Sequence, residues 1–73
     1  MAEFNILSEI RASVWQVEVA VGDSVTAGQD LIILESMKTE IPVTAPRGGT
    51  VSAILVAEGD SVDERQPLIT LVD

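Results

Sequence analysis

The chain has 73 residues and a formal net charge of −8, and it contains neither cysteine nor histidine. A chain of this length predicts one small domain, residues 1–73, whose core is too small to enclose an ordinary catalytic cleft. Without cysteine and histidine, disulfides, thiolate metal sites and imidazole acid–base chemistry are excluded. The acidic balance argues against nucleic acid and against an anionic membrane surface as partners, because both favour clustered lysine and arginine.

The N-terminal segment lacks a basic region followed by an apolar stretch, so no signal peptide is predicted. No apolar run approaches the roughly 20 residues that a membrane-spanning helix needs. We therefore expect a cytoplasmic protein that is not an enzyme on its own and that has no membrane partner.

Short runs rich in β-branched residues follow one another along the chain, separated by glycine and proline. Evenly spaced short strands without a helical period are typical of an all-β barrel or sandwich. In the second of these runs, alternation places Trp15 on the same face as Val17 and Val19, which predicts a core or half-buried tryptophan. The predicted strands are Phe4–Ser8, Val14–Val19, Leu31–Ser36, Glu40–Ala45, Thr50–Val56 and Leu68–Val72.

The sequence repeats at an offset of 37 residues, since Gly22-Asp23-Ser24-Val25 recurs as Gly59-Asp60-Ser61-Val62. Two copies at a fixed offset predict intertwined halves related by an approximate two-fold axis. The expected architecture is a flattened barrel or sandwich of two antiparallel sheets. One position breaks the repeat, because Arg65 stands where the first copy has Gly28. If Gly28 needs a positive φ, its counterpart is expected to form a different turn.

Lys38 is the only lysine of the chain, and it lies between two predicted strands. If the strands reach Ser36 and resume at Thr39, only Met37 and Lys38 connect them. Such two-residue turns need positive φ and normally recruit asparagine or glycine, so long side chains there cost about 1–3 kcal/mol. Local rules tend to be broken where function overrides them. We therefore favour a lysine displayed for modification over an ordinary solvated one, with the chain termini near the opposite end of the barrel.

The neighbours of this turn resemble a known family. Glu35-Ser36-Met37-Lys38 followed by Glu40-Ile41-Pro42-Val43 is similar to the attachment motif of biotinyl domains, the carriers of biotin-dependent carboxylases. Ala45-Pro46 with Gly49 looks like the family's Ala-Pro-x-x-Gly turn. The resemblance covers nearly the whole chain, and short, stand-alone biotin attachment proteins are most similar.

The resemblance implies that a biotin protein ligase couples biotin to the ε-amine of Lys38 and reads Glu35, Met37 and Thr39 beside it. The chain would then be a non-catalytic biotin carboxyl carrier, moving a carboxyl group between a biotin carboxylase and a carboxyltransferase. Lysine amines are mostly protonated at neutral pH and are weak nucleophiles, so the ligase must supply an activated acyl group.

Thr39 departs from the family pattern, which usually has a second methionine there. We expect the ligase to tolerate this change. Lipoyl domains share the fold and also modify a hairpin lysine, typically with Asp before it and Ala after it, which Met37 and Thr39 do not match. Glu35-Ser36 would also suit the lipoyl-carrying protein of glycine cleavage. A lipoyl carrier and an unmodified interaction module therefore stay open as alternatives.

Overall fold

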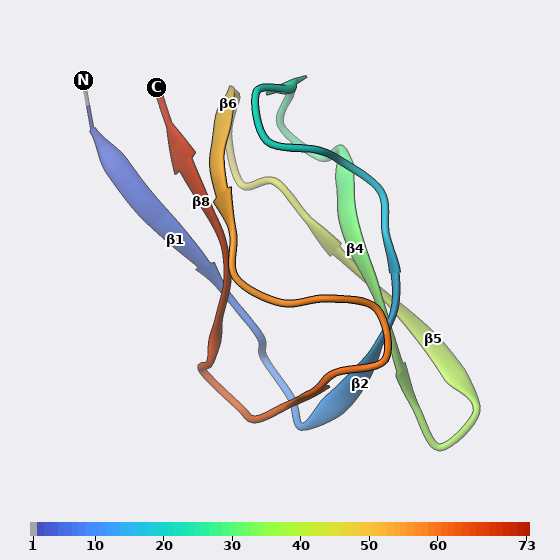
Figure 1. The fold of residues 1–73 in the computed structure, drawn as a ribbon. Coiled ribbons are helices and arrows are strands. Elements are labelled where there is room, and N and C mark those ends of the chain that lie inside the picture. Colours follow the sequence, from blue (N-terminus) through green and yellow to red (C-terminus); the bar gives the residue numbers. More distant parts are fainter. Residues whose placement is uncertain (1) are drawn as a thin grey trace.

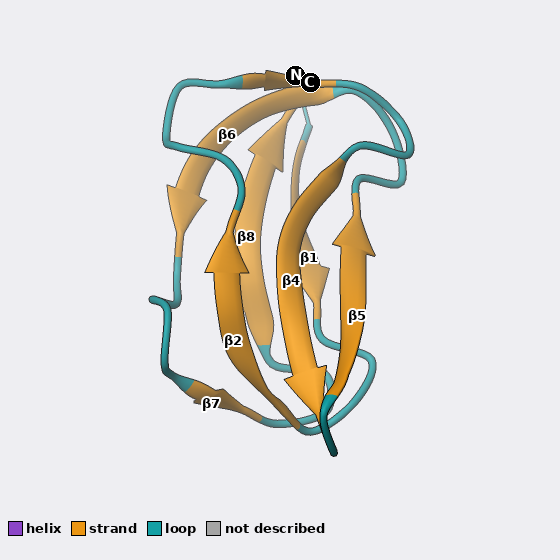
Figure 2. Cartoon of the chain, turned by 90° about the vertical axis from the view of Figure 1, so that its right-hand side faces the viewer, coloured by secondary structure: helices purple, strands orange, loops and turns teal. Residues whose placement is uncertain are grey.

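The computed structural model describes residues 2–73, which form two antiparallel sheets packed face to face (Figures 1 and 2). The strand orders are β1-β8-β6-β3 in one sheet and β5-β4-β2-β7 in the other. The predicted all-β, two-sheet architecture is confirmed. In the part of the chain described, nothing helical has the length and apolar character of a membrane span. The strands are β1 (Glu3–Leu7), β2 (Ala12–Val17), β3 (Ser24–Val25), β4 (Asp30–Ser36), β5 (Thr39–Thr44), β6 (Gly49–Ile54), β7 (Ser61–Val62) and β8 (Pro67–Val72).

The two sequence halves contribute strands to both sheets. Each strand from β1 to β4 has its counterpart, 37 residues later, in β5 to β8. Replacing every strand by its counterpart converts the strand order of one sheet into that of the other. Hydrogen bonds between the halves repeat in the same way. The Val14 N–H donates to the Asp60 carbonyl at 2.8 Å, and the Val51 N–H donates to the Asp23 carbonyl at 2.9 Å. Each half therefore holds a turn of the other, as the two-fold prediction requires.

The core lies between the sheets and is built mainly from β4 and β8. Each of these strands is flanked by a strand on both sides and is rich in apolar residues. Fully burying one such aliphatic side chain contributes about 1.5–3 kcal/mol. Because the buried positions are repeat counterparts, both sheets are anchored by the same pattern. The largest buried side chains on these two strands are Leu31, Ile32, Leu34, Leu68, Ile69 and Leu71.

Trp15 is exposed at the surface over nearly half of its area, so the predicted core position is wrong. The pairing of β2 with β4 shifts between Val14 and Gln16, which marks a bulge at the tryptophan. A bulge adds one residue to a strand and so reverses the alternation on its far side. Val14 consequently faces the core at 2% exposure, whereas Trp15 is 44% exposed.

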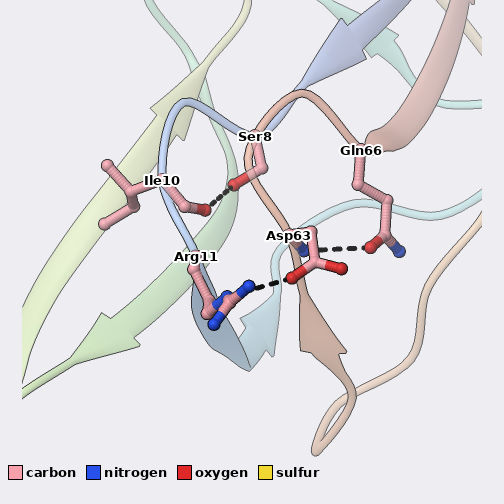
Figure 3. Close-up of polar contacts among 5 residues, drawn as sticks. All are labelled: Ser8, Ile10, Arg11, Asp63 and Gln66. Atoms are coloured by element: carbon pink, nitrogen blue, oxygen red, sulfur yellow. Dashed lines mark hydrogen bonds and ion pairs between the residues drawn. The ribbon is translucent and has the colours of Figure 1, made fainter.

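Arg65 forms the same turn as its counterpart, so the prediction of a different turn is also wrong. Its φ is 68°, and that of Gly28 is 86°. The surrounding hydrogen bonds repeat: the Arg65 N–H donates to the Ser8 carbonyl at 2.6 Å, and the Gly28 N–H donates to the Ala45 carbonyl at 2.8 Å. The Asp63 N–H also donates a hydrogen bond to Gln66 Oε1 at 3.0 Å (Figure 3). These bonds fix the backbone without help from glycine.

The molecule is elongated, 37 × 18 × 17 Å, with the β4–β5 turn at one end and both termini at the other (Figure 2). The Asp73 N–H donates to the Ala2 carbonyl at 3.1 Å. By the repeat, this contact corresponds to the Ser36–Thr39 pair below the Lys38 turn. The predicted placement of the turn and the termini is confirmed.

Candidate functional site

Lys38 lies in the turn that joins β4 to β5, and Figure 1 shows this hairpin at the end of the molecule away from the termini. Ser36 and Thr39 form the last pair of the ladder, which leaves Met37 and Lys38 as the two turn residues. Their φ angles are 53° and 66°. Two consecutive positive φ values are characteristic of a type I′ turn. The predicted two-residue turn, with positive φ at both Met37 and Lys38, is confirmed.

The turn holds its side chains in solvent. Met37 is 94% exposed, and Lys38 is exposed beside it. The ion pairs of residues 2–73 join Arg11 to Asp63 and Arg47 to Asp73, so neither involves Lys38. No side-chain hydrogen bond in this range uses its amine either. The amine is therefore accessible to an acylating partner.

The hairpin carries this amine clear of the core. Leu34, fully buried, pairs with Ile41, and two further pairs separate this level from the turn. At about 3.3 Å per residue, Lys38 lies roughly 10 Å along the strand from Ile41. Because β4 also pairs with β2, the base of the hairpin is fixed in its sheet while its tip stays narrow.

The other predicted site residues surround Lys38 at the surface. Met37 precedes it in the turn, Thr39 begins β5, and Glu35 is an exposed residue next to the last position of β4. Glu35 pairs directly with Glu40 across the ladder. Like charges opposite each other destabilise a sheet. The Glu35–Glu40 pair is therefore a second unfavourable feature next to Lys38, after the positive φ angles of the turn. The structure thus brings all four residues together at one tip.

Acidic residues elsewhere serve the turns. The Ala20 N–H donates to Asp23 Oδ2 at 2.9 Å, and the Ala57 N–H donates to Asp60 Oδ2 at the same distance. Within residues 2–73, no group of three or more histidine, cysteine, aspartate or glutamate residues is placed to hold a metal ion. These features define a two-sheet frame that displays its one lysine amine at a hairpin tip, the arrangement needed to carry an amide-linked group.

Sequence comparison assigns this frame to a family. The profile of the biotin/lipoyl family, described as "Biotin-requiring enzyme", matches residues 6–71. The chain is 43% identical over 63 residues to the biotin/lipoyl attachment protein of Bacillus subtilis, covering 86% of each. It is 48% identical over 62 residues to the biotinylated protein TB7.3 homolog of Mycobacterium leprae, covering 85% of this chain and 86% of the relative. The chain therefore belongs to the biotin/lipoyl family.

Solved structures agree on the fold. The urea carboxylase of Kluyveromyces lactis matches 99% of this chain with a TM-score of 0.91 and 38% identity. A single-chain, multi-domain long-chain acyl-CoA carboxylase matches 93% of it with a TM-score of 0.88 and 28% identity. The chain corresponds to only 6% and 7% of these two enzymes. It is therefore similar to one small module of each.

Proposed function

We propose that this chain is a biotin carboxyl carrier, with biotin amide-linked to Nζ of Lys38 and residues 1–73 acting as one attachment domain. The observation that carries the proposal is a single exposed lysine on a type I′ turn of a biotin/lipoyl-family fold. The biotin carboxyl carrier protein of Streptococcus mutans supports it, at 46% identity over 59 residues, covering 81% of this chain and 45% of the relative.

Biotin, when bound, supplies a ring nitrogen that accepts and releases a carboxyl group. The chain contributes an amine at a narrow tip, which can enter the active site of a partner. Glu35, Met37 and Thr39 flank this amine and offer the ligase its contact surface. No histidine or cysteine is present to act as a base or nucleophile, so a ligase, a biotin carboxylase and a carboxyltransferase would perform the chemistry. We propose that this activity takes place in the cytoplasm.

Tethering explains why a carrier needs no catalytic group of its own. A group attached to Lys38 meets successive active sites intramolecularly, at a high effective concentration set by the length of the arm. The 37 Å length of the frame separates this arm from the terminal end. The frame can therefore be held at one end while the tip is presented to a partner.

The test is biotinylation of the intact chain by a purified biotin protein ligase with biotin and ATP. Intact mass is expected to rise by one biotinyl group, and streptavidin is expected to capture the product. Lys38→Arg is the matched control, because it keeps the charge and length but offers no acylatable amine. An unmodified chain in the presence of active ligase, or equal labelling of the Lys38→Arg variant, would contradict the proposal.

A lipoyl carrier is the second candidate. The dihydrolipoyllysine-residue acetyltransferase component of the Haemophilus influenzae pyruvate dehydrogenase complex is 48% identical over 50 residues, covering 68% of this chain and 9% of the relative. A parallel reaction with lipoate and a lipoate ligase separates the two, since the added masses differ. An interaction module would keep its unmodified mass in both reactions.

A further inference from the structure

An apolar groove opens between β1 and β5, which are edge strands of the two sheets. Its volume is about 430 Å³, within the range of small-molecule sites. One residue of β4, Leu34, contributes to the lining, and the loop after β1 contributes Glu9 and Ile10. The apolar lining comes mainly from Ile6, Ile10, Leu34, Ile41 and Val43.

The repeat exposes a difference between the two ends of this groove. Towards the termini, the Arg47 guanidinium lies 4.2 Å from the centre of the Phe4 ring and pairs with Asp73 at 2.9 Å. Towards the lysine turn, the counterparts of Arg47 and Phe4 are Ile10 and Ile41, and both line the groove. A cation covers the aromatic ring at one end, whereas at the lysine end two isoleucines stand at these positions, with Glu9 beside Ile10 in the lining.

Ile10 is held in place by contacts on both sides (Figure 3). The buried Ser8 hydroxyl donates to the Ile10 carbonyl at 2.6 Å, and Arg11 Nε donates to Asp63 Oδ1 at 3.1 Å. In Figure 3 the Ile10 side chain points away from the Arg11–Asp63 pair. The Ser8 bond anchors the Ile10 backbone, whereas the exposed Arg11–Asp63 pair adds little because solvent screens it.

We propose that the lysine end of this groove receives the bicyclic ring of the biotin carried by Lys38, with the arm folded back along β5. The inference rests on the proposed function. Ile41 lies about 10 Å along the strand from Lys38. About eleven bonds separate the lysine Cα from the biotin ring, or roughly 14 Å when extended. The arm therefore reaches Ile41 and Ile10 and falls short of the terminal end.

The chemistry of the groove suits this occupant. Biotin's ring and chain are uncharged, and most of the lining is apolar. The polar lining residues include Glu9 and Asn5, and the Asn5 Oδ1 atom accepts a hydrogen bond from Thr70 Oγ1 at 2.8 Å.

The test compares methyl NMR spectra of the loaded and unloaded chain, with loading at Lys38 verified by mass and peptide mapping. If the ligase leaves the chain unmodified, Lys38 is acylated chemically with an active ester of biotin. A failed ligation then counts against the proposed function alone, while the spectra still decide the groove. We expect loading to shift the Ile10 and Ile41 methyl signals and to give nuclear Overhauser contacts with ring protons.

Two variants make the test specific. Ile10→Arg introduces the residue found at the counterpart position and is expected to abolish the ring contacts. Leu55→Arg is the matched control, exposed and outside the groove, and is expected to keep them. Should Ile10→Arg fail to fold, Ile10→Thr replaces it, because it keeps the β-branched shape, makes the wall polar and is expected to weaken the contacts. Shifts confined to residues 36–40, or equal contacts in Ile10→Arg and Leu55→Arg, would overturn the proposal.

Discussion

At the tip of the β4–β5 hairpin, Met37 and Lys38 occupy positions that asparagine and glycine fill at lower cost. Their positive φ angles are imposed from below, where Ser36 pairs with Thr39. Strain of this kind costs of order 1–3 kcal/mol, and the ladder and core offset it. As a result, two paired strands fix the backbone of Lys38 while its side chain stays exposed.

The first prediction concerns this strain. Replacing the turn by Asn-Gly (Met37→Asn with Lys38→Gly) is expected to stabilise the fold by about 1–2 kcal/mol, because both residues tolerate φ > 0. The same variant is expected to lose biotinylation completely. Urea unfolding measures the first effect and intact mass the second. Lys38→Arg is the control, expected to lose biotinylation while its unfolding midpoint hardly moves. A lower midpoint for the Asn-Gly variant would show that the turn is not strained.

The second prediction concerns Thr39, which departs from the family pattern. Thr39→Met is expected to raise kcat/KM for ligation two- to tenfold, equivalent to about 0.4–1.4 kcal/mol of extra contact with the ligase. Thr39 is exposed and pairs with Ser36 through the backbone, so the fold is expected to tolerate the change. Steady-state biotinylation rates measure the effect. Thr39→Ala removes the hydroxyl without adding a thioether, and a matching gain there would contradict this explanation.

At the scale of the elements, the two equivalent turns before β4 and β8 offer an internal comparison. Arg65 and Gly28 share a left-handed backbone, and no atom lies within 4 Å of a Cβ built on Gly28. The third prediction is that Arg65→Gly stabilises the fold by up to about 1 kcal/mol, whereas Gly28→Arg destabilises it by about 1–2 kcal/mol. Urea midpoints at unchanged slope measure both. Opposite signs are the expected result, and a loss of stability in both variants would show that the Arg65 side chain contributes contacts.

The sequence predicts the long strands and the lysine turn because each has a local signal. Alternation and flanking glycines mark the strands, and the two-residue connection marks the turn at Lys38. β3 and β7 have only two residues each and pair with strands of the other half, so no local pattern reveals them. The bulge at Trp15 and the turn at Arg65 are set by partners distant in sequence. The groove could not be predicted for the same reason, because no local sequence pattern indicates that Ile10 and Ile41 line the same groove.

At the scale of the whole molecule, one sequence pattern is used twice to build the frame and only once to build the site. The repeat places matching strands, turns and buried residues in both sheets. Its two ends then diverge. One end carries the lysine turn and an open apolar groove, whereas the other carries the termini and the Arg47–Phe4–Asp73 cluster. Asymmetric function here results from a few side chains at the ends of a nearly symmetric fold.

This relation gives the last prediction. Ala2 and Asp73 already make two hydrogen bonds, from the Asp73 N–H to the Ala2 carbonyl at 3.1 Å and from the Ala2 N–H to Asp73 Oδ1 at 2.8 Å. Joining them through Asn-Gly, in place of Met1, would complete a second two-residue hairpin at the counterpart of the lysine turn. Closing a loop of this length removes entropy from the unfolded chain worth at most about 4.5 kcal/mol. We expect the cyclised protein to unfold at a higher urea concentration than a linear chain carrying the same added residues, with biotinylation of Lys38 unchanged. An equal or lower midpoint would mean that Ala2 and Asp73 do not meet in hairpin geometry.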